Sequence, residues 1–538
     1  MSMLADRNDA SVGEVIPESL RFEGASKSSV ITQRSTVKFY PTSGMQVKSS
    51  ENKVTILRLS SSDFIDPRTA TLDFRLSVPD PKIVPEDLLQ SLIQSMSLQI
   101  GGVEISHVDN FGESYKMLAY ASCPKHVYDH GWHANMGSYK YRQCKRANIY
   151  QGADHDGTDM TSADVTNKVI LGQIYDHTSY PAYPEENQYY TTYGDGKQGK
   201  WCSIPLAELL GFFKIKTLIA MPFLGSVDIT IHWAEFNKAM LVHSGLARDA
   251  TSGIVADANA DLGANLDYYK LDDITVSCDT CALDRTFVSL LSGLVSSSPA
   301  GITMPFEDMA TSVKSFDNAG TNSIYISKGV SYLKKLFWGL RSQKHVNNRF
   351  VDKSQFKFAD AFRGGSYQVE IGSRLFPENR CTSTSTAFVE LTKAVDSIGH
   401  YDQGGVIDDE CYHGVVNGTL TEAPYVPDPT APVKHPHGYR ETPQAFIMGQ
   451  NLERAMGAGS LSGLSLKLSG YSIHLQLSLR QSAAESQFVD NMNGLTAVKN
   501  RLRYEPNLPL WNQQMNLLTC MLYDKSVVLR QDAITVSE

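Results

Sequence analysis

The chain has 538 residues, of which 42% are hydrophobic and 20% charged, and its formal net charge is −9. This composition is typical of a globular protein and excludes an intrinsically disordered one. The negative charge argues against a protein that coats nucleic acid, because binding to phosphates needs clustered Lys and Arg. The length is too great for one hydrophobic core and predicts two or three domains.

The first 38 residues are polar and balanced in charge. They show no clear alternation before Val37, so we expect residues 1–38 to be an N-terminal arm that folds only against a partner. Its apolar side chains Ile16, Leu20 and Phe22 are the candidates for docking in an assembly. The beginning of the chain lacks the apolar core of a secretion signal, which predicts synthesis in the cytosol.

Residues 39–240 are predicted to form a first β-domain. Several short segments alternate apolar and polar residues, which places every second side chain on one buried face of a strand. The alternating apolar positions are Val54 and Ile56; Leu72, Phe74, Leu76 and Val78; Met96, Leu98 and Ile100; and Val227, Ile229, Ile231 and Trp233. Gly101-Gly102 stands between two such segments and predicts a tight hairpin.

A short helix is expected after this hairpin, because Phe111, Tyr115 and Leu118 share one helical face. The stretch from about 120 to 200 has little periodicity and is expected to be mostly loop. Residues 241–268 are rich in Ala, Asp and Gly and are interpreted as the linker between two domains.

Residues 269–538 are predicted to form a second β-domain with the same kind of alternation. Its apolar positions are Ile324 and Ile326; Tyr367, Val369 and Ile371; Leu464, Leu466 and Leu468; Tyr471, Ile473, Leu475, Leu477 and Leu479; and Val527 and Leu529. Residues 421–443 hold six of the 22 prolines, so we expect an exposed loop insertion there. The sequence as a whole predicts an all-β protein of paired sandwiches or jelly rolls.

The most metal-like cluster is a histidine-rich tract. His126 and His130 have the spacing of helical zinc sites, and His133 follows with Asp129 between them. Pro and Gly residues surround the tract and it contains no Glu that could act as a base. A polar surface loop is therefore favoured over a metal site.

Other motifs are incomplete. Residues 194–201 have the Gly and Gly-Lys spacing of a phosphate loop, but Trp201 stands where a hydroxyl should reach Mg²⁺. Cys278 and Cys281 form a single CxxC that follows a predicted strand, and no second pair completes a zinc ribbon. The eight cysteines are expected to be reduced thiols. No catalytic motif and no cofactor site is predicted.

Several local stretches resemble the double jelly-roll major capsid proteins of the adenovirus-like lineage, and most closely those of polinton-like viruses and virophages. The stretches are Ile204-Pro205-Leu206, Leu209-Leu210-Gly211-Phe212, Met221-Pro222-Phe223-Leu224-Gly225, Tyr367 to Gly372, Phe376-Pro377, Ala387 to Lys393 and Tyr523-Asp524. The resemblance spans roughly residues 40–538 and is one of pattern and length.

This resemblance implies two eight-stranded barrels with long loop insertions and a few short helices. It implies a structural viral protein without enzymatic activity, in which three copies form a pseudo-hexagonal capsomer of an icosahedral shell. The implied partners are the chain itself, penton proteins and minor capsid proteins, without direct sequence-specific nucleic-acid binding. The implied location is the virion; the sequence is silent on an internal membrane.

Two alternatives stay open. The first is a carbohydrate-binding or glycoside-cleaving β-sandwich protein, which would more often carry a signal peptide and disulfides. The second is a viral spike or minor penton component, which the length of two domains disfavours. A fold by itself does not settle function.

Overall fold

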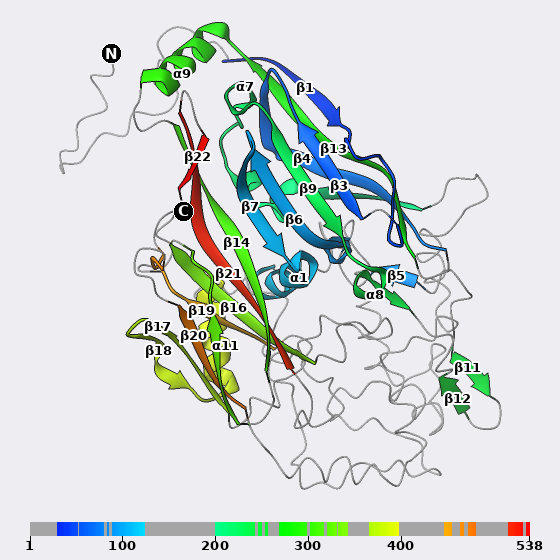
Figure 1. The fold of residues 1–538 in the computed structure, drawn as a ribbon, viewed down its shortest axis with the longest axis vertical. Coiled ribbons are helices and arrows are strands. Elements are labelled where there is room, and N and C mark those ends of the chain that lie inside the picture. The colour runs from blue at the N-terminus through cyan, green and yellow to red at the C-terminus, as the bar shows by residue number, and fades with distance from the viewer. Residues whose placement is uncertain are drawn as a thin grey trace, which may run out of the picture.

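The computed structural model describes a large part of the chain. The described residues are 30–51, 53–79, 83–85, 89–123, 199–242, 246–249, 253–256, 268–297, 302–316, 320–330, 332–342, 365–397, 446–453, 463–466, 472–479, 515–530 and 534–537. Their ribbon shows two groups of strands side by side, with the first group in the upper part of Figure 1 and the second at the lower left.

The first group is a barrel of two facing sheets. In chain order its eight main strands are β1 (Ile31–Phe39), β3 (Val54–Leu59), β4 (Phe64–Ser77), β6 (Ile93–Ile100), β7 (Val103–Asp109), β8 (Lys200–Pro205), β9 (Val227–Trp233) and β13 (Lys270–Leu283). One sheet has the order β1-β13-β4-β8 and the other the order β3-β9-β6-β7, with antiparallel pairing throughout.

The second group is built in the same way. Its eight main strands are β14 (Ile302–Phe316), β15 (Thr321–Ile326), β16 (Leu333–Ser342), β17 (Ser366–Ile371), β18 (Arg374–Cys381), β19 (Ile447–Asn451), β20 (Ile473–Ser478) and β21 (Met515–Leu529). One sheet has the order β14-β21-β16-β19 and the other the order β15-β20-β17-β18.

Both barrels therefore have one topology. Counted from one to eight along the chain, the strands of each barrel lie in the orders 1-8-3-6 and 2-7-4-5. The first and last strands of a barrel are hydrogen-bonded neighbours, as in a jelly roll of eight strands. The predicted fold class, two consecutive eight-stranded jelly rolls, is confirmed.

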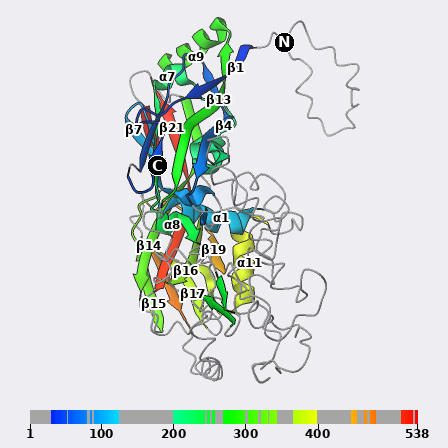
Figure 2. The same cartoon turned by 90° about the vertical axis from the view of Figure 1, so that its right-hand side faces the viewer.

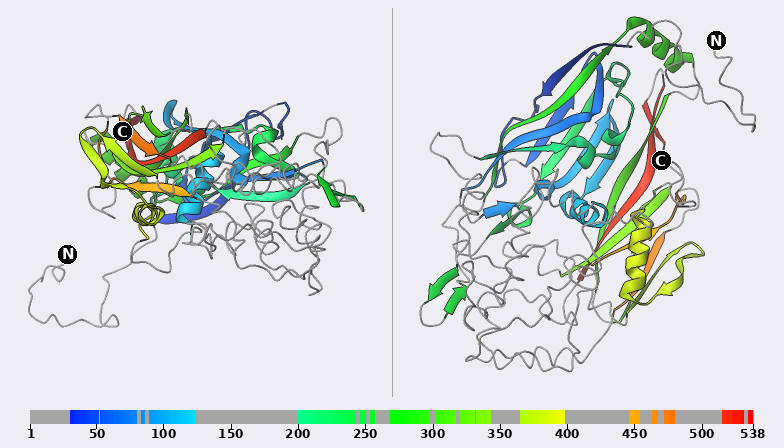
Figure 3. Two further views of the ribbon diagram at one scale, coloured as in Figure 1. Left: turned by 90° about the horizontal axis from the view of Figure 1, so that it is seen from below. Right: turned by 180° about the vertical axis from the view of Figure 1, so that it is seen from behind.

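Short elements complete the described chain. The additional strands are β2 (Val47–Lys48), β5 (Ile83–Pro85), β10 (Met240–Val242), β11 (Leu246–Asp249), β12 (Gly253–Ala256) and β22 (Ile534–Ser537). The helices are η2 (Leu89–Leu92), α1 (Phe111–Ser122), α6 (Leu206–Leu209), η4 (Gly211–Lys214), α7 (Met221–Leu224), α8 (Phe236–Ala239), α9 (Arg285–Ser297) and α11 (Thr384–Ala394). The predicted short helix after the first hairpin is α1, and α11 follows the fifth strand of the second barrel, packed against β19 (Figure 3).

Most alternating segments form strands with the predicted buried face. Strand β3 is the exception: Ile56, predicted to be buried, is 37% exposed, and Leu57 and Leu59 are buried in its place. In β9 the odd-numbered residues from Val227 to Trp233 are buried and the residues between them are half-buried or exposed. The β6–β7 hairpin turns at Gly101 and Gly102, whose φ angles of 56° and 82° lie in the region that favours glycine. The cores contain edge-to-face aromatic pairs, Phe74 with Trp233 in the first barrel and Trp338 with Tyr367 in the second.

The predicted domain boundaries need correction at two places. Residues 31–38, predicted to belong to the arm, form most of β1, which pairs with β13 along its length. The arm prediction failed here because β1 is an edge strand exposed on both faces, so no hydrophobic alternation marks it. Ile16, Leu20 and Phe22 lie outside the described residues.

The second correction concerns the linker. Strand β13, predicted to open the second domain, is the eighth strand of the first barrel, because it pairs with β1, β2 and β4. The predicted linker 241–268 therefore lies within the first jelly roll and contains the β11–β12 hairpin. The two barrels are joined after β13, in the segment that holds helix α9 (Figure 1). The proline-rich insertion 421–443 lies outside the described residues.

Candidate functional site: the contact between the two barrels

The two barrels are held together by a contact that is largely buried. Strand β7, helix α1 and helix η4 of the first barrel pack against β14, β16 and β21 of the second. Figure 1 shows the long strands β14 and β21 running beside β7, and the side view in Figure 2 shows α1 at the level where the barrels meet. The fifth strand of one barrel thus meets the first and eighth strands of the other.

A buried polar cluster lies at the centre of this contact. The Asp308 carboxylate accepts hydrogen bonds from Ser106 Oγ at 2.7 Å and from the Tyr523 hydroxyl at 3.1 Å. Lys525 Nζ lies 3.5 Å from Asp308 Oδ2 and donates to the Ile105 carbonyl oxygen at 2.7 Å. Because Ser106 and Ile105 belong to the first barrel and the other residues to the second, these bonds tie the barrels together.

Burial decides the electrostatics of this cluster. Asp308 is 3% exposed and Lys525 is 6% exposed. Burial raises the pKa of the Asp308 carboxyl, and this effect outweighs the lowering by Lys525 and by the hydrogen bonds. A buried carboxylate of this kind is tolerated because its partners replace the lost water. Removing Asp308 or Lys525 would take away the opposite charge that stabilises the other in this buried place.

Apolar packing and one glycine set how closely the barrels approach. The ring of Phe212 in η4 meets that of Phe306 in β14 edge to face, with centroids 5.6 Å apart. At Gly211 an added Cβ would lie 1.7 Å from the Glu307 carbonyl oxygen, so the position has no room for a side chain. Thr311 Oγ1 also donates to the Asp109 carbonyl oxygen at 2.5 Å.

Further charges flank the contact. Arg341 of β16 is 3% exposed, and its guanidinium lies 2.7 Å from the carboxylate of Glu113 in α1. Lys334 bridges three carboxylates, at 3.2 Å from Glu307, 3.3 Å from Glu453 and 3.6 Å from Asp524. Burial by itself would lower the pKa of Lys334, but the three carboxylates outweigh burial and raise it. Glu307 and Asp524 face each other across the β14–β21 ladder, so Lys334 neutralises a like-charge pair.

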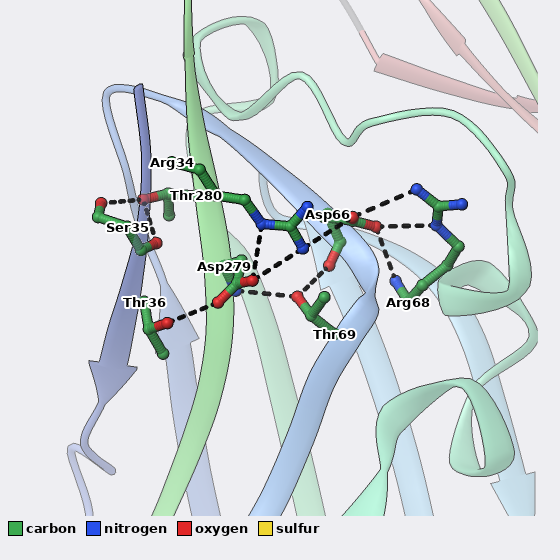
Figure 4. Close-up of polar contacts among 8 residues, drawn as sticks. All are labelled: Arg34, Ser35, Thr36, Asp66, Arg68, Thr69, Asp279 and Thr280. Atoms are coloured by element: carbon green, nitrogen blue, oxygen red, sulfur yellow. Dashed lines mark hydrogen bonds and ion pairs between the residues drawn. The ribbon is translucent and has the colours of Figure 1, made fainter. Parts of the chain in front are cut away.

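The first barrel carries a polar cluster at the corresponding place. Asp279 is the tenth residue of β13. The tenth residue of β21 is Asp524, which precedes Lys525. Strand β13 begins opposite Ser77, the last residue of β4, and β21 begins opposite Ser342, the last residue of β16. Figure 4 shows the cluster around Asp279, to which β1, β4 and β13 contribute.

Two arginines hold this second cluster. Arg34 donates to Asp279 at 2.8 Å and to Asp66 at 3.4 Å, and Arg68 donates to Asp66 at 3.1 Å (Figure 4). Thr36 donates to Asp279 at 2.7 Å. The hydrogen bond from Thr36 has the largest effect on Asp279 and that from Arg34 the next largest, and both lower the pKa of its carboxyl. The Arg34 and Arg68 side chains are 49% and 68% exposed, so this cluster lies open where that of the second barrel is covered.

The motifs singled out in the sequence are not brought together by the structure. His126, His130 and His133 lie outside the described residues. Cys278 and Cys281 are both buried in β13, which continues to Leu283 where a loop was predicted. Burial raises the pKa of Cys278 to about 12, so this thiol is not a nucleophile at neutral pH.

Trp201, which occupies the hydroxyl position of the incomplete phosphate loop, lies in strand β8, not at the start of a helix. It pairs with Arg75 across the β4–β8 ladder and stacks under its guanidinium. Among the described residues, no group of three or more His, Cys, Asp or Glu side chains is arranged to hold a metal ion. Within the same residues, no helix combines the length and apolar character needed to cross a membrane.

Sequence reasoning missed the residues of the barrel contact. The available signal was the presence of charges inside strands, Glu307-Asp308 in β14 and Asp524-Lys525 in β21. A charge in a strand that is otherwise apolar needs a buried partner. Nothing in the sequence of β7 identifies Ser106 as that partner.

Comparisons with known proteins agree with the topology. No protein-family model matches the chain, and no curated protein matches it. A chain of the Sputnik virophage structure is 10% identical, with a TM-score of 0.53, over 98% of this chain and 93% of that one. The mavirus major capsid protein is 8% identical, with a TM-score of 0.47, over 97% of this chain and 93% of that one.

The Faustovirus major capsid protein is also similar, at 8% identity and a TM-score of 0.47, over 95% of this chain and 92% of that one. At these identities the likeness concerns the fold. The predicted resemblance in fold is confirmed: the chain has the double jelly-roll fold, and its likeness to the Sputnik chain extends over both barrels.

Proposed function

We propose that the protein is a viral major capsid protein, a structural subunit without enzymatic activity that assembles with copies of itself. The observation that carries this proposal is the repetition of one jelly roll within one chain, with the two copies fixed side by side by a buried contact. The likeness to the Sputnik virophage chain over both barrels supports it.

The capsomer is proposed to be a homotrimer. Each chain supplies two similar lobes, so three chains in a closed ring supply six, which gives a pseudo-hexagonal outline. Closed cyclic symmetry is the usual form of self-association, because head-to-tail contacts that do not close produce filaments. Capsomers of this outline would tile an icosahedral shell, and the virion is the proposed location of the protein.

Additional partners follow from the same proposal. A closed shell needs other proteins at its fivefold vertices and between capsomers, so we propose penton and minor capsid proteins as partners. The arm, now limited to the residues before β1, is proposed to serve assembly through Ile16, Leu20 and Phe22. Synthesis is proposed to take place in the host cytosol.

Electron microscopy of the purified protein tests the proposal. Negatively stained particles should show six lobes around a central axis, in place of the two lobes of a single chain. Particles with two lobes at all concentrations would overturn the proposed capsomer. A hydrolytic activity on polysaccharides, lost on mutation of a carboxylate pair, would instead support the glycoside-cleaving alternative.

A further inference from the structure

The outer face of the sheet β15-β20-β17-β18 holds a hydrogen-bonded chain of a serine, a histidine and a glutamate. His474 in β20 lies directly opposite Tyr325 in β15 and Glu370 in β17, its two neighbouring strands. Ser323 precedes Tyr325 by two residues and therefore lies on the same face of β15. The alternate residues of these strands, such as Leu475, are buried in the core, so the serine, the histidine and the glutamate all point outward.

The three side chains are bonded in the order that a serine nucleophile requires. His474 Nδ1 lies 3.1 Å from Glu370 Oε2, and His474 Nε2 is hydrogen-bonded to Ser323 Oγ. An ionised carboxylate only accepts hydrogen bonds, so the single hydrogen of a neutral imidazole lies on Nδ1. Nε2 therefore accepts the hydroxyl hydrogen of Ser323. This is the arrangement of a nucleophile, a general base and an orienting carboxylate.

The imidazole and its carboxylate are held by further contacts. The ring of His474 stacks on that of Tyr325, with centroids 4.3 Å apart and an angle of 1° between the ring planes. Gln476 Nε2 donates to the same Glu370 oxygen at 3.2 Å, and the Arg380 guanidinium donates to Gln476 Oε1 at 2.6 Å. Packing and hydrogen bonds of this kind keep a reactive group in one geometry before any ligand arrives.

The serine is open to solvent, whereas its base is largely covered. Ser323 is exposed, and the side chain of His474 is 16% exposed. Tyr325 is 59% exposed and offers an aromatic surface beside the serine, against which an apolar acyl or aryl group can lie. A small molecule can therefore reach the hydroxyl of Ser323 from the solvent.

The first barrel offers an exposed serine whose hydroxyl is bonded differently. Ser203 in β8 donates directly to Asp73 Oδ1 at 2.6 Å. Ser277 in β13 donates to the other oxygen of the same carboxylate, also at 2.6 Å. A carboxylate is a weaker base than an imidazole and is less suited to take a hydroxyl proton at neutral pH. Ser203 is thus the matched control for Ser323.

We propose that Ser323 is a nucleophile that accepts acyl groups from activated esters, with His474 as the general base and Glu370 as its positioning residue. Ser323 Oγ forms a bond to the ester carbonyl carbon, and the bond from that carbon to the leaving oxygen breaks. The hydroxyl proton passes to His474 Nε2 and then to the leaving oxygen. The products are an ester on Ser323 and a free alcohol. This modification goes beyond the proposed structural function and does not depend on it.

Incubation with p-nitrophenyl acetate tests this reaction, because released p-nitrophenolate gives the rate and the acetyl group marks the site. The tryptic peptide 315–328 contains Ser323, and its fragmentation in the mass spectrometer distinguishes Ser323 from Tyr325. We expect the acetyl group on Ser323 of the wild-type protein and none on Ser203. Acetyl groups found on Tyr325 or on lysines, with none on Ser323, would overturn the proposal.

Three variants assign the roles. Ser323→Ala should remove the acetyl group from the peptide, and His474→Gln should slow acetylation of Ser323 by about a hundredfold or more. The wild-type rate should rise between about pH 5 and about pH 8, because only a neutral imidazole accepts a proton, and His474→Gln should lack this rise. Glu370→Gln should keep the rise at a rate at least about tenfold lower, because it still has the base but orients it less well.

The controls separate chemistry from folding. The three substituted side chains lie on an outer face, so the melting temperatures of the variants should stay close to that of wild type. His107 bonds to Asp109 at 3.1 Å on β7, and His107→Gln should leave acetylation of Ser323 unchanged. Equal rates at Ser323 in wild type and in folded His474→Gln would overturn the role of the histidine.

The result is independent of the proposed capsid function. Acetylation is measured on single chains or assemblies alike, so a failure to form trimers would leave this inference standing. An unlabelled Ser323 in protein that forms trimers would overturn the inference and leave the trimer in place. If a variant failed to fold, the site of acetylation in the wild-type protein would still decide the question.

Discussion

The two barrels share one topology but differ in what covers the sheet of their first and eighth strands. In the second barrel this sheet is covered by the first barrel, and Asp308 is 3% exposed. In the first barrel the equivalent sheet is open, and Arg34 and Arg68 are about half exposed or more, at 49% and 68%. The same scaffold thus carries a buried polar cluster in one copy and an open one in the other.

The difference shows how a repeated fold unit can serve two purposes. The covered cluster fixes the barrels relative to each other, since its hydrogen bonds run from one barrel to the other. The open cluster keeps its ion pairs within one barrel, where water screens them and they contribute little stability. Substitutions in the two clusters should therefore have different consequences.

The largest effect is expected from Asp308→Ala. The substitution leaves Lys525 buried without its carboxylate partner, which should lower the free energy of unfolding by about 3–5 kcal/mol. Asp228→Ala is the control, because Asp228 pairs with the exposed Arg58 on the outer face of the first barrel. Urea unfolding monitored by tryptophan fluorescence measures both, and an equal loss in the two variants would contradict the role of the barrel contact.

Gly211→Ala should come next. Its Cβ would meet the Glu307 carbonyl oxygen at 1.7 Å, so η4 and β14 must separate, at a cost of about 1–3 kcal/mol. Gly293→Ala in α9 is the matched control, because an added Cβ there meets no atom within 4 Å. The control should be neutral or slightly stabilising, since alanine favours a helix over glycine. A melting temperature lowered equally in both would count against a tight contact at Gly211.

The pH dependence should differ in sign between the clusters. The raised pKa of Asp308 means that the folded chain takes up this proton at a higher pH than the unfolded chain does. Protonation of Asp308 therefore stabilises the folded chain increasingly as the pH falls from the pKa of this group in the folded chain to its lower pKa in the unfolded chain. Asp279 has a lowered pKa, so its contribution is present above its unfolded pKa and is lost as the pH falls through the folded one.

Urea midpoints of wild type, Asp308→Asn and Asp279→Asn between about pH 7 and about pH 3 would measure this difference. As the pH falls, the urea midpoint of wild type should rise relative to that of Asp308→Asn. Over the same range, the difference in urea midpoint between wild type and Asp279→Asn should become smaller. The same trend in both variants would show that the two clusters are electrostatically alike.

The smallest effect is expected from Arg68→Ala. Arg68 is 68% exposed and bonds only within the open cluster, and Arg34 still reaches Asp66 after its removal. The melting temperature of the single chain should change less than in Asp308→Ala or Gly211→Ala. A loss as large as that of Asp308→Ala would mean that the open cluster holds the barrel together.

The sequence predicted the fold well where strands have one buried face. Alternation identified β4, β9 and β20 with their buried faces. It also identified β3 as a strand but assigned the buried face to Val54 and Ile56, whereas Leu57 and Leu59 are buried. It identified only the end of β21, at Val527 and Leu529, because 14 of the 15 residues of this strand are buried and no polar face exists. A strand that is buried on both faces loses the alternation on which such predictions depend.

The boundaries and the candidate site were harder to predict for physical reasons. β1 is exposed on both faces, so its polar sequence resembled an arm. β13 pairs with β1 and β4 across nearly the whole first barrel, and sequence alone does not reveal pairing between such distant segments. The barrel contact depends on Asp308 meeting Ser106, two residues that only the fold brings together.

Hydrogen exchange of the backbone amides tests the central claim most directly, because it reports whether the contact between the barrels belongs to the single chain. Strands β7 and β14 should be protected in the concentrated protein and should keep that protection on dilution to single chains, because the bonds of Asp308 and Lys525 join the two barrels of one chain. Loss of protection in β7 and β14 on dilution would contradict a buried contact between the barrels of one chain.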